Sequence, residues 1–240
     1  MTKKQLATTA EQLPAYLAQG QGARGSEQVE SDDMQLPRIK ILQALSPEIS
    51  KADRKIPGAE IGMFVNTLTG EMFESATIVP VYFVKKWMTW PDRDKRPTEQ
   101  LRGVFDDEVE ATRAKLYDDD LVQYTPTHIV LIVSEAGGIE EASIPCPSTK
   151  IKVSKQLNSL IRMGKVDSFA QSFTMTSVNE TNAKGDFANF RFTPAGFVSE
   201  EVYRYGESLY EALHSGSVNI SDDSLVDTGD DDGEGPPAGF

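Results

Sequence analysis

The feature that most constrains the fold of this chain is the run ATIVPVYFVKKWMTW at residues 76–90. Most of its side chains are β-branched or aromatic, and such side chains favour strands because they fit a pleated, half-buried surface. Pro80 interrupts the run, and proline has no N–H group to give to a sheet. We therefore expect a long strand that either lies at a sheet edge or carries a bulge at this proline.

Turn residues between apolar runs predict further strands. Residues 36–42 alternate polar and apolar side chains, which predicts a first strand. Short segments rich in Gly, Asn and Thr separate three pairs of apolar runs, and each pair predicts a hairpin: residues 62–66 with 71–73, 127–134 with 139–144, and 168–178 with 187–193. Hairpins make antiparallel sheets, and we find no alternation of helices with parallel strands.

Helices are a minor part of the expected fold. A helix is predicted near residues 106–117, a second from an N-cap at Thr149 to Met163, and a third from an N-cap at Ser199 to His214. The fold class is therefore mainly β with added helices (α+β), built as an antiparallel barrel or sandwich.

The charge of the chain is uneven along its length. The 240 residues carry 24 basic and 37 acidic side chains, a net charge of −13. Residues 221–240 hold seven of the acids and no base, in a Ser-, Gly- and Pro-rich context. Such a segment cannot bury enough apolar surface to offset its ordering entropy. We expect a flexible N-terminal arm at residues 1–33, one domain at 34–216, and a disordered acidic tail at 217–240.

The tail has two interpretations. It is either a solubilising segment or a peptide presented to a partner, because its acids can steer and its terminal ring can fill a pocket. The second interpretation assigns partner binding to Asp230, Asp231, Asp232, Glu234 and Phe240.

The opposite charge occurs inside the chain. Residues 142–166 contain no acid and five bases, among them Lys150, Lys152, Lys155 and Arg162. A second basic cluster at residues 85–102 is partly offset by acids. These islands predict a polyanion-binding surface that the tail can cover; the alternative is an ordinary solvated helix face.

Aromatic and basic side chains alternate at the end of the long strand. Its period of two places Tyr82, Lys86 and Trp90 on one face and Phe83, Lys85 and Trp87 on the other. If only one face packs into the core, the other exposes flat rings beside a cation, as single-stranded nucleic acid requires for its bases and phosphates. The alternative buries both faces, and the pattern does not decide which face is open.

Catalytic, metal and membrane signals are weak. One cysteine, Cys146, excludes an intrachain disulfide, and with two histidines it excludes a Cys/His zinc site. His128 in an apolar strand is expected to be a core histidine, and Asp118–Asp120 a solvated turn. We find no phosphate loop, nucleophile elbow or metalloprotease motif. We therefore expect no enzyme, cofactor or metal, and the lack of an apolar span or leader predicts a cytoplasmic protein.

Several segments together resemble a known class. They are PRIKILQALSPEIS, GMFVNTLTGEMF, VPVYFVKKWMTW, FAQSFTMTSVNETNAKGDFANFRFTPAGFV and the acidic tail ending in phenylalanine. The chain is similar in these to single-stranded-DNA-binding proteins of tailed bacteriophages. The resemblance implies an OB-fold-like barrel and an acidic tail that contacts replication and recombination proteins and competes with DNA for the groove.

Three functions are weighed on this basis. The first is a non-catalytic, sequence-independent single-stranded-DNA-binding protein of phage replication or recombination, acting in the host cytoplasm; a homodimer is compatible with it. The second is an acidic phage structural or inhibitory protein, such as a DNA mimic, without a nucleic-acid groove. The third is an enzyme with an unrecognised carboxylate site. The basic islands favour the first over the second, because a DNA mimic has no use for them.

Overall fold

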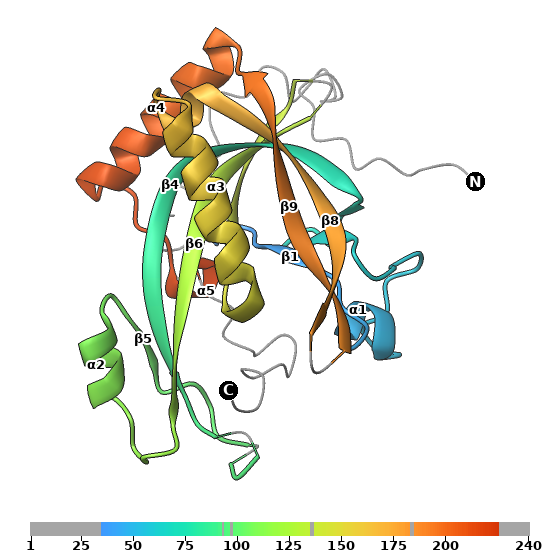
Figure 1. Ribbon diagram of the computed structural model, residues 1–240, viewed down its shortest axis with the longest axis vertical. Coiled ribbons are helices and arrows are strands. Elements are labelled where there is room, and N and C mark those ends of the chain that lie inside the picture. Colours follow the sequence, from blue (N-terminus) through green and yellow to red (C-terminus); the bar gives the residue numbers. More distant parts are fainter. Residues whose placement is uncertain (1–34, 93, 97, 135–136, 183–184, 226–240) are drawn as a thin grey trace, which may run out of the picture.

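The computed structural model describes residues 35–92, 94–96, 98–134, 137–182 and 185–225 (Figure 1). Its strands are β1 (Ile39–Ile41), β2 (Phe64–Asn66), β3 (Met72–Phe73), β4 (Ser75–Trp90), β5 (Gly103–Phe105), β6 (Leu121–Val133), β7 (Ile139–Pro145), β8 (Gln171–Asn182) and β9 (Gly185–Phe197). Its α-helices are α1 (Pro47–Ser50), α2 (Glu108–Arg113), α3 (Ile151–Met163), α4 (Glu200–Ser215) and α5 (Asp222–Leu225).

The strands form two antiparallel sheets. The larger has six strands in the order β7-β6-β4-β8-β9, with β5 pairing with β4, and the smaller has the order β1-β2-β3. The predicted α+β class is confirmed, and all three predicted hairpins form. Between the described strands the pairing ends at β7 on one side and β9 on the other, so no closed barrel is found.

A bulge at Pro80 shapes the long strand. β4 lies inside the sheet, paired with both β6 and β8, and its register with β6 shifts between Pro80 and Tyr82. The shift accommodates the residue that lacks an N–H group, which is why proline is tolerated in a central strand. Of the two predicted placements of this proline, the bulge is therefore the observed one. Figure 1 shows β4 as a strongly curved ribbon through the molecule.

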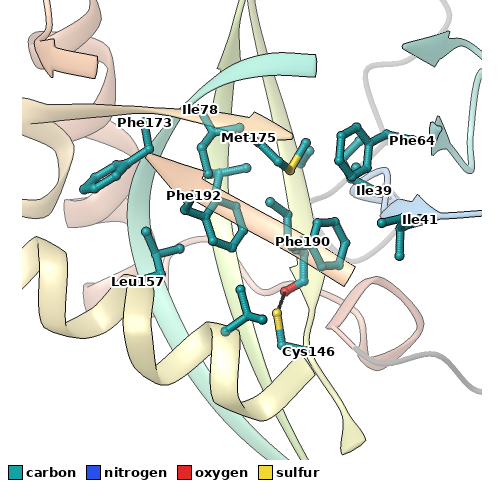
Figure 2. Packing of buried hydrophobic residues seen from close by; sticks show 14 of the residues in the cluster. Ile39, Ile41, Phe64, Ile78, Cys146, Leu157, Phe173, Met175, Phe190 and Phe192 are labelled. Atoms are coloured by element: carbon teal, nitrogen blue, oxygen red, sulfur yellow. Dashed lines mark hydrogen bonds between the residues drawn. The ribbon is translucent and has the colours of Figure 1, made fainter. Parts of the chain in front are cut away.

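One apolar core lies between the large sheet, the small sheet and α3. We call it the α3-side core. Figure 2 shows Leu157 of α3 opposite the rings that β8 and β9 contribute. The ring of Phe190 stacks on Phe64 at a centroid distance of 5.5 Å and lies 6.0 Å from Phe192. This core therefore ties the small sheet to the large one.

A second apolar core lies on the other face of the large sheet, under α4 and α5. We call it the α4-side core. Ile78 of β4 belongs to the α3-side core and its neighbour Val79 to the α4-side core, as the alternation of a strand requires. Ser199 caps α4 as predicted, its hydroxyl accepting from the Val202 N–H at 3.4 Å. A sheet packed on both faces explains the continuous apolar runs within β4 and β6.

The sequence analysis missed some short elements. β5 was not predicted; it lies between the charged segment that follows Trp90 and α2. α3 begins after a short 3-10 turn, Ser148–Lys150, in place of a cap at Thr149. The folded part also continues past the predicted boundary at residue 216. Leu225 of α5 is only 4% exposed and packs into the α4-side core. Side chains of the large sheet hydrogen-bond to backbone carbonyls of α5, so its burial leaves these carbonyls satisfied.

Three hydrogen bonds hold α5 in place. The Thr127 hydroxyl donates to the Leu225 carbonyl, and the Ser143 hydroxyl to the Ser224 carbonyl. The Leu36 N–H donates to the Ser224 hydroxyl at 2.9 Å. The last described residues therefore also hold the first ones. The predicted N-terminal arm and the tail beyond Leu225 lie outside the described residues.

Candidate nucleic-acid interface

The structure divides the predicted site residues of β4 between two environments. The face with Tyr82, Lys86 and Trp90 is turned to the α4-side core. The Tyr82 ring packs 6.0 Å from Tyr210 of α4, and Trp90 is 1% exposed. Trp90 therefore cannot stack on a base in this conformation, which corrects its assignment to the interface. An indole this large is buried where the sheet and loops close around it.

Lys86 lies on the same face and is paired. Its ammonium group is 2.9 Å from a carboxylate oxygen of Asp106 and 3.2 Å from one of Asp222 in α5. Burial alone would lower the pKa of Lys86, but hydrogen bonds and charge from the two carboxylates outweigh it and raise that pKa above its usual value. The charge that was predicted to meet a phosphate is thus already neutralised by acids of the chain itself.

The other face of β4 keeps an aromatic pair near solvent. Trp87 and its cross-strand neighbour Tyr124 of β6 lie with ring centroids 5.0 Å apart. Both are half-buried, and Lys85, on the same face, is exposed. Cross-strand neighbours share a face, so rings and cation lie together. We call Lys85, Trp87 and Tyr124 the aromatic patch; Tyr124 was missed because only its pairing with Trp87 reveals it.

The position of α3 explains why this patch stays open. His128, further along β6, is buried, and its Nε2 lies 2.8 Å from the Ser154 hydroxyl of α3. Phe83, the cross-strand neighbour of His128, is 5.0 Å from that ring and half-covered. α3 begins at Ile151 and therefore covers the Phe83 end of the strand pair and leaves the Trp87 end uncovered. Figure 1 shows this lower end of β4 and β6 beside β5 and α2.

α3 carries a row of exposed basic side chains, which we call the basic wall. Lys152, Lys155 and Arg162 are all exposed, and their spacing of three and seven residues places them on one side of the helix. Lys150 precedes the helix, with its ammonium 5.6 Å from the centroid of the Phe190 ring. The predicted cations of residues 150–162 are therefore brought together on one element.

A groove runs between α3 and the hairpin of β8 and β9. Its volume is about 920 Å³. Lys152 and Lys155 line it from α3, and Arg191 of β9 lines it from the other side with one acid, Glu180 of β8. Phe190 and Phe192 supply apolar lining. Sequence reasoning missed Arg191, an isolated base in a strand that becomes relevant only through its neighbours in space.

Cross-strand pairing connects the patch to the groove. Lys85 pairs with Pro126, whose carbonyl accepts from the Cys146 N–H at 2.8 Å. Cys146 is followed by Lys150 and then by α3. The end of the sheet that carries Lys85 is thus joined by a backbone hydrogen bond to the segment that leads into α3.

The second basic cluster serves the structure instead. Arg96 is 2.9 Å from Asp120, whose side chain is fully buried, and 2.5 Å from Asp119. Arg102 bonds to Asp120 at 3.3 Å and to Glu99. The Arg96 guanidinium also lies 4.3 Å from the Tyr117 ring centroid. Two of the three acids expected in a solvated turn, Asp119 and Asp120, are therefore ion-pair partners that hold the segment around β5 and α2.

His128 and Cys146, the two side chains weighed for catalysis, are both buried. Burial lowers the pKa of His128 to about 4, so its ring is neutral near pH 7, as expected of a core histidine. Burial likewise raises the pKa of the Cys146 thiol to about 12, which leaves it protonated and a poor nucleophile. Within the ranges that the structure describes, no group of three or more metal-ligating side chains is found, and no helix is long and apolar enough to cross a membrane.

Comparison with known proteins defines the broader class. A family model described as Pam3 phage gp34-like protein matches residues 3–219, most of the chain. The protein is therefore a phage protein. It belongs to the Pam3 phage gp34-like family. No curated protein and no solved structure matches the chain.

The assigned tail residues remain a prediction. Asp230, Asp231, Asp232, Glu234 and Phe240 lie outside the described residues. The described part of the tail nevertheless brings one acid, Asp222, to a lysine of β4.

Proposed function

We propose that this phage protein is a non-catalytic, sequence-independent single-stranded-DNA-binding protein. The observation that carries the proposal is the aromatic patch, where Trp87 and Tyr124 form a half-buried pair beside the exposed Lys85. Aromatic faces accept any unstacked base, and a nearby ammonium group attracts the backbone phosphate. Double-stranded DNA keeps its base faces stacked and so cannot use the rings, which makes the single strand the favoured ligand.

The basic wall of α3 supports the same ligand. Lys152, Lys155 and Arg191 line the groove that follows the patch, and Glu180 is its one acidic lining residue. The Glu180 carboxylate accepts a hydrogen bond from the Asn189 side-chain amide at 3.1 Å, so one of its oxygens already has a partner within the protein. A polyanion held at the rings therefore has cations along its onward course.

We propose further that the fold is OB-fold-like and that the acidic tail regulates DNA binding. Binding does not require a closed barrel, because an open, bent sheet can expose the same side chains. We propose that the acids beyond Leu225 compete with DNA for the basic surface and that Phe240 recruits replication or recombination proteins in the host cytoplasm. The ion pair between Asp222 and Lys86 supports this, since it fixes the start of the tail at β4, the strand that carries Trp87.

Tryptophan fluorescence provides the test, because Trp87 is partly exposed and Trp90 is buried. We expect oligothymidylate to quench the emission of the wild type and of Trp90→Phe, but not that of Trp87→Phe. Trp87→Ala should weaken binding by about 1–3 kcal/mol with the fold intact.

Two results would oppose the proposal. If no quenching occurs and Trp87→Ala binds oligothymidylate as the wild type does, the aromatic patch binds no bases. If the protein binds no single strand at any salt concentration, the proposal gives way to an acidic structural or inhibitory phage protein.

A further inference from the structure

The C-terminal end of α3 exposes large apolar side chains at one corner of the molecule. Phe197, at the end of β9, is 77% exposed, and Met163, in the last turn of α3, is 75% exposed. Val166, just beyond the helix, is 46% exposed. Apolar side chains that gather at a surface with polar neighbours mark interaction sites. This corner lies at the opposite end of α3 from the aromatic patch.

A bulge in β9 turns the Phe197 ring towards the α3 side of the sheet. Ser172 of β8 pairs with Gly196, whereas the next residue, Phe173, pairs with Pro194, so Ala195 is an extra residue in β9. Without it, the alternation from Phe192, which faces the α3-side core, would turn Phe197 to the opposite face. The bulge reverses the alternation and restores Phe197 to the face that α3 occupies.

The cross-strand neighbour of Phe197 locates this ring more closely. Phe197 pairs with Gln171, and directly opposed residues share a face. The Gln171 side-chain amide donates to the Ile161 carbonyl, in the last turn of α3, at 3.1 Å. Phe197 therefore lies beside the C-terminal end of α3.

Both signs of charge occur at this corner. Glu200 and Glu201 begin α4 three residues after Phe197, and Arg204 lies 3.8 Å from Glu200, whereas the C-terminal end of α3 is basic. Arg162 in the last turn of α3 and Lys165 just after it are both exposed, and no acid occurs from residue 142 to residue 166. The next acid along the chain, Asp167, accepts a hydrogen bond from the Tyr203 hydroxyl at 2.9 Å. An exposed ring beside two cations repeats the composition of the aromatic patch.

We propose that Phe197 is a second base-stacking platform and that Arg162 and Lys165 hold the phosphates next to it. The inference rests on the proposed function and extends it: one DNA strand leaves Trp87, follows the groove beside α3 and ends its contacts on Phe197. Arg162 lies on the same side of α3 as the groove-lining Lys152 and Lys155, which favours DNA over a second copy of the chain as the occupant. α3 has 13 residues and is about 20 Å long, so only a long strand reaches both platforms.

Oligonucleotide length separates the two platforms experimentally. We would measure the affinity of Phe197→Ala for oligothymidylates of about 4 and about 20 nucleotides, at the lower limit and beyond the upper limit of usual single-strand sites. The short strand is followed by quenching of Trp87. We expect Phe197→Ala to weaken binding of the long strand about 5- to 150-fold and to leave quenching by the short strand unchanged.

Two further variants serve as controls. Leu45→Ala removes an apolar side chain of similar exposure, 74%, outside α3 and the β8–β9 hairpin, and should change neither affinity. Phe197→Trp in a Trp87→Phe background keeps a ring at the corner and should be quenched by the long strand. Unchanged thermal unfolding would separate these effects from a loss of fold.

The outcomes distinguish this inference from the proposed function. If Phe197→Ala binds the long strand as Leu45→Ala does while Trp87 is still quenched, the second platform is wrong and the aromatic patch stands. If Phe197→Ala instead converts a dimer to a monomer without changing affinity, the corner is a contact between copies and the inference fails. If neither strand quenches Trp87, the proposed function itself fails.

Discussion

The two faces of β4 between Tyr82 and Trp90 carry the same kinds of side chain and have opposite fates. On one face, Lys85 and Trp87 remain accessible beside Tyr124. On the other, Lys86 is paired with two carboxylates and Trp90 is buried in the α4-side core. A lysine and a tryptophan thus become a candidate interface or part of the interior according to the elements that cover them.

The comparison teaches that a basic, aromatic composition is not by itself a binding surface. α4, α5 and their acids close one face, whereas α3 stops short of the Trp87 end of the other. Arg96 and Arg102 are a second example, because they form ion pairs with Asp119, Asp120 and Glu99. Only a cation without such neighbours is available to a phosphate.

The largest expected difference between the two faces is in stability. Trp90→Ala should lower the free energy of unfolding by about 3–5 kcal/mol, because it empties a fully buried site. Trp87→Ala should cost about 1 kcal/mol, since its ring is only partly buried. Urea denaturation of both variants measures this, and equal losses would break the comparison.

The covered part of the Trp87 face can be tested by pH. Neutral His128 is favoured in the folded state, where its pKa is about 4 compared with 6.5 for the free side chain. As pH falls from 6.5 to 4, the unfolded chain binds a proton that the folded chain does not, so stability declines by about 3 kcal/mol.

His128→Leu should remove this part of the pH dependence. The measurement is the free energy of unfolding at several pH values between 7 and 4. The same slope in the variant and the wild type would mean that α3 does not bury a neutral ring.

Two truncations separate the structural part of the C-terminal segment from the part that competes with DNA. Truncation after Leu225 removes five acids but keeps α5, and should strengthen single-strand binding about tenfold at low salt and less at high salt. Truncation after Ile220 also removes the buried Leu225 and Asp222, one of the two partners of Lys86, so it should lower stability in addition. Unchanged DNA affinity at about 20 mM salt would reduce the tail to a solubilising segment.

The smallest expected effect compares two adjacent lysines. Lys85→Gln should reduce the dependence of log K on log salt by about 0.7, the contribution of one phosphate contact to single strands. Lys86→Gln should leave the slope unchanged, because Asp106 and Asp222 already neutralise that charge. Titrations at several salt concentrations test this pair, and an equal change in both variants would show that Lys86 also contacts DNA.

Local patterns predicted most of the elements. The density of β-branched and aromatic residues predicted β4. The missing N–H of Pro80 predicted either an edge position or a bulge, and the structure has the bulge. Ser199 at the start of α4 and the hairpins around Gly137 and Gly185 depend on neighbours within a few residues, which the sequence contains. β5 and α5 were missed because they are too short to have a period and gain their stability from distant partners.

The sequence by itself determined which side chains were available for a candidate interface: the alternating rings and lysines of β4, the acid-free stretch around α3 and the acidic tail. Only the tertiary structure decided which of them remain exposed. Alternation assigns residues to faces but does not say what covers a face. That depends on contacts between residues far apart in sequence, such as Asp222 with Lys86 and Ser154 with His128, which no local pattern encodes.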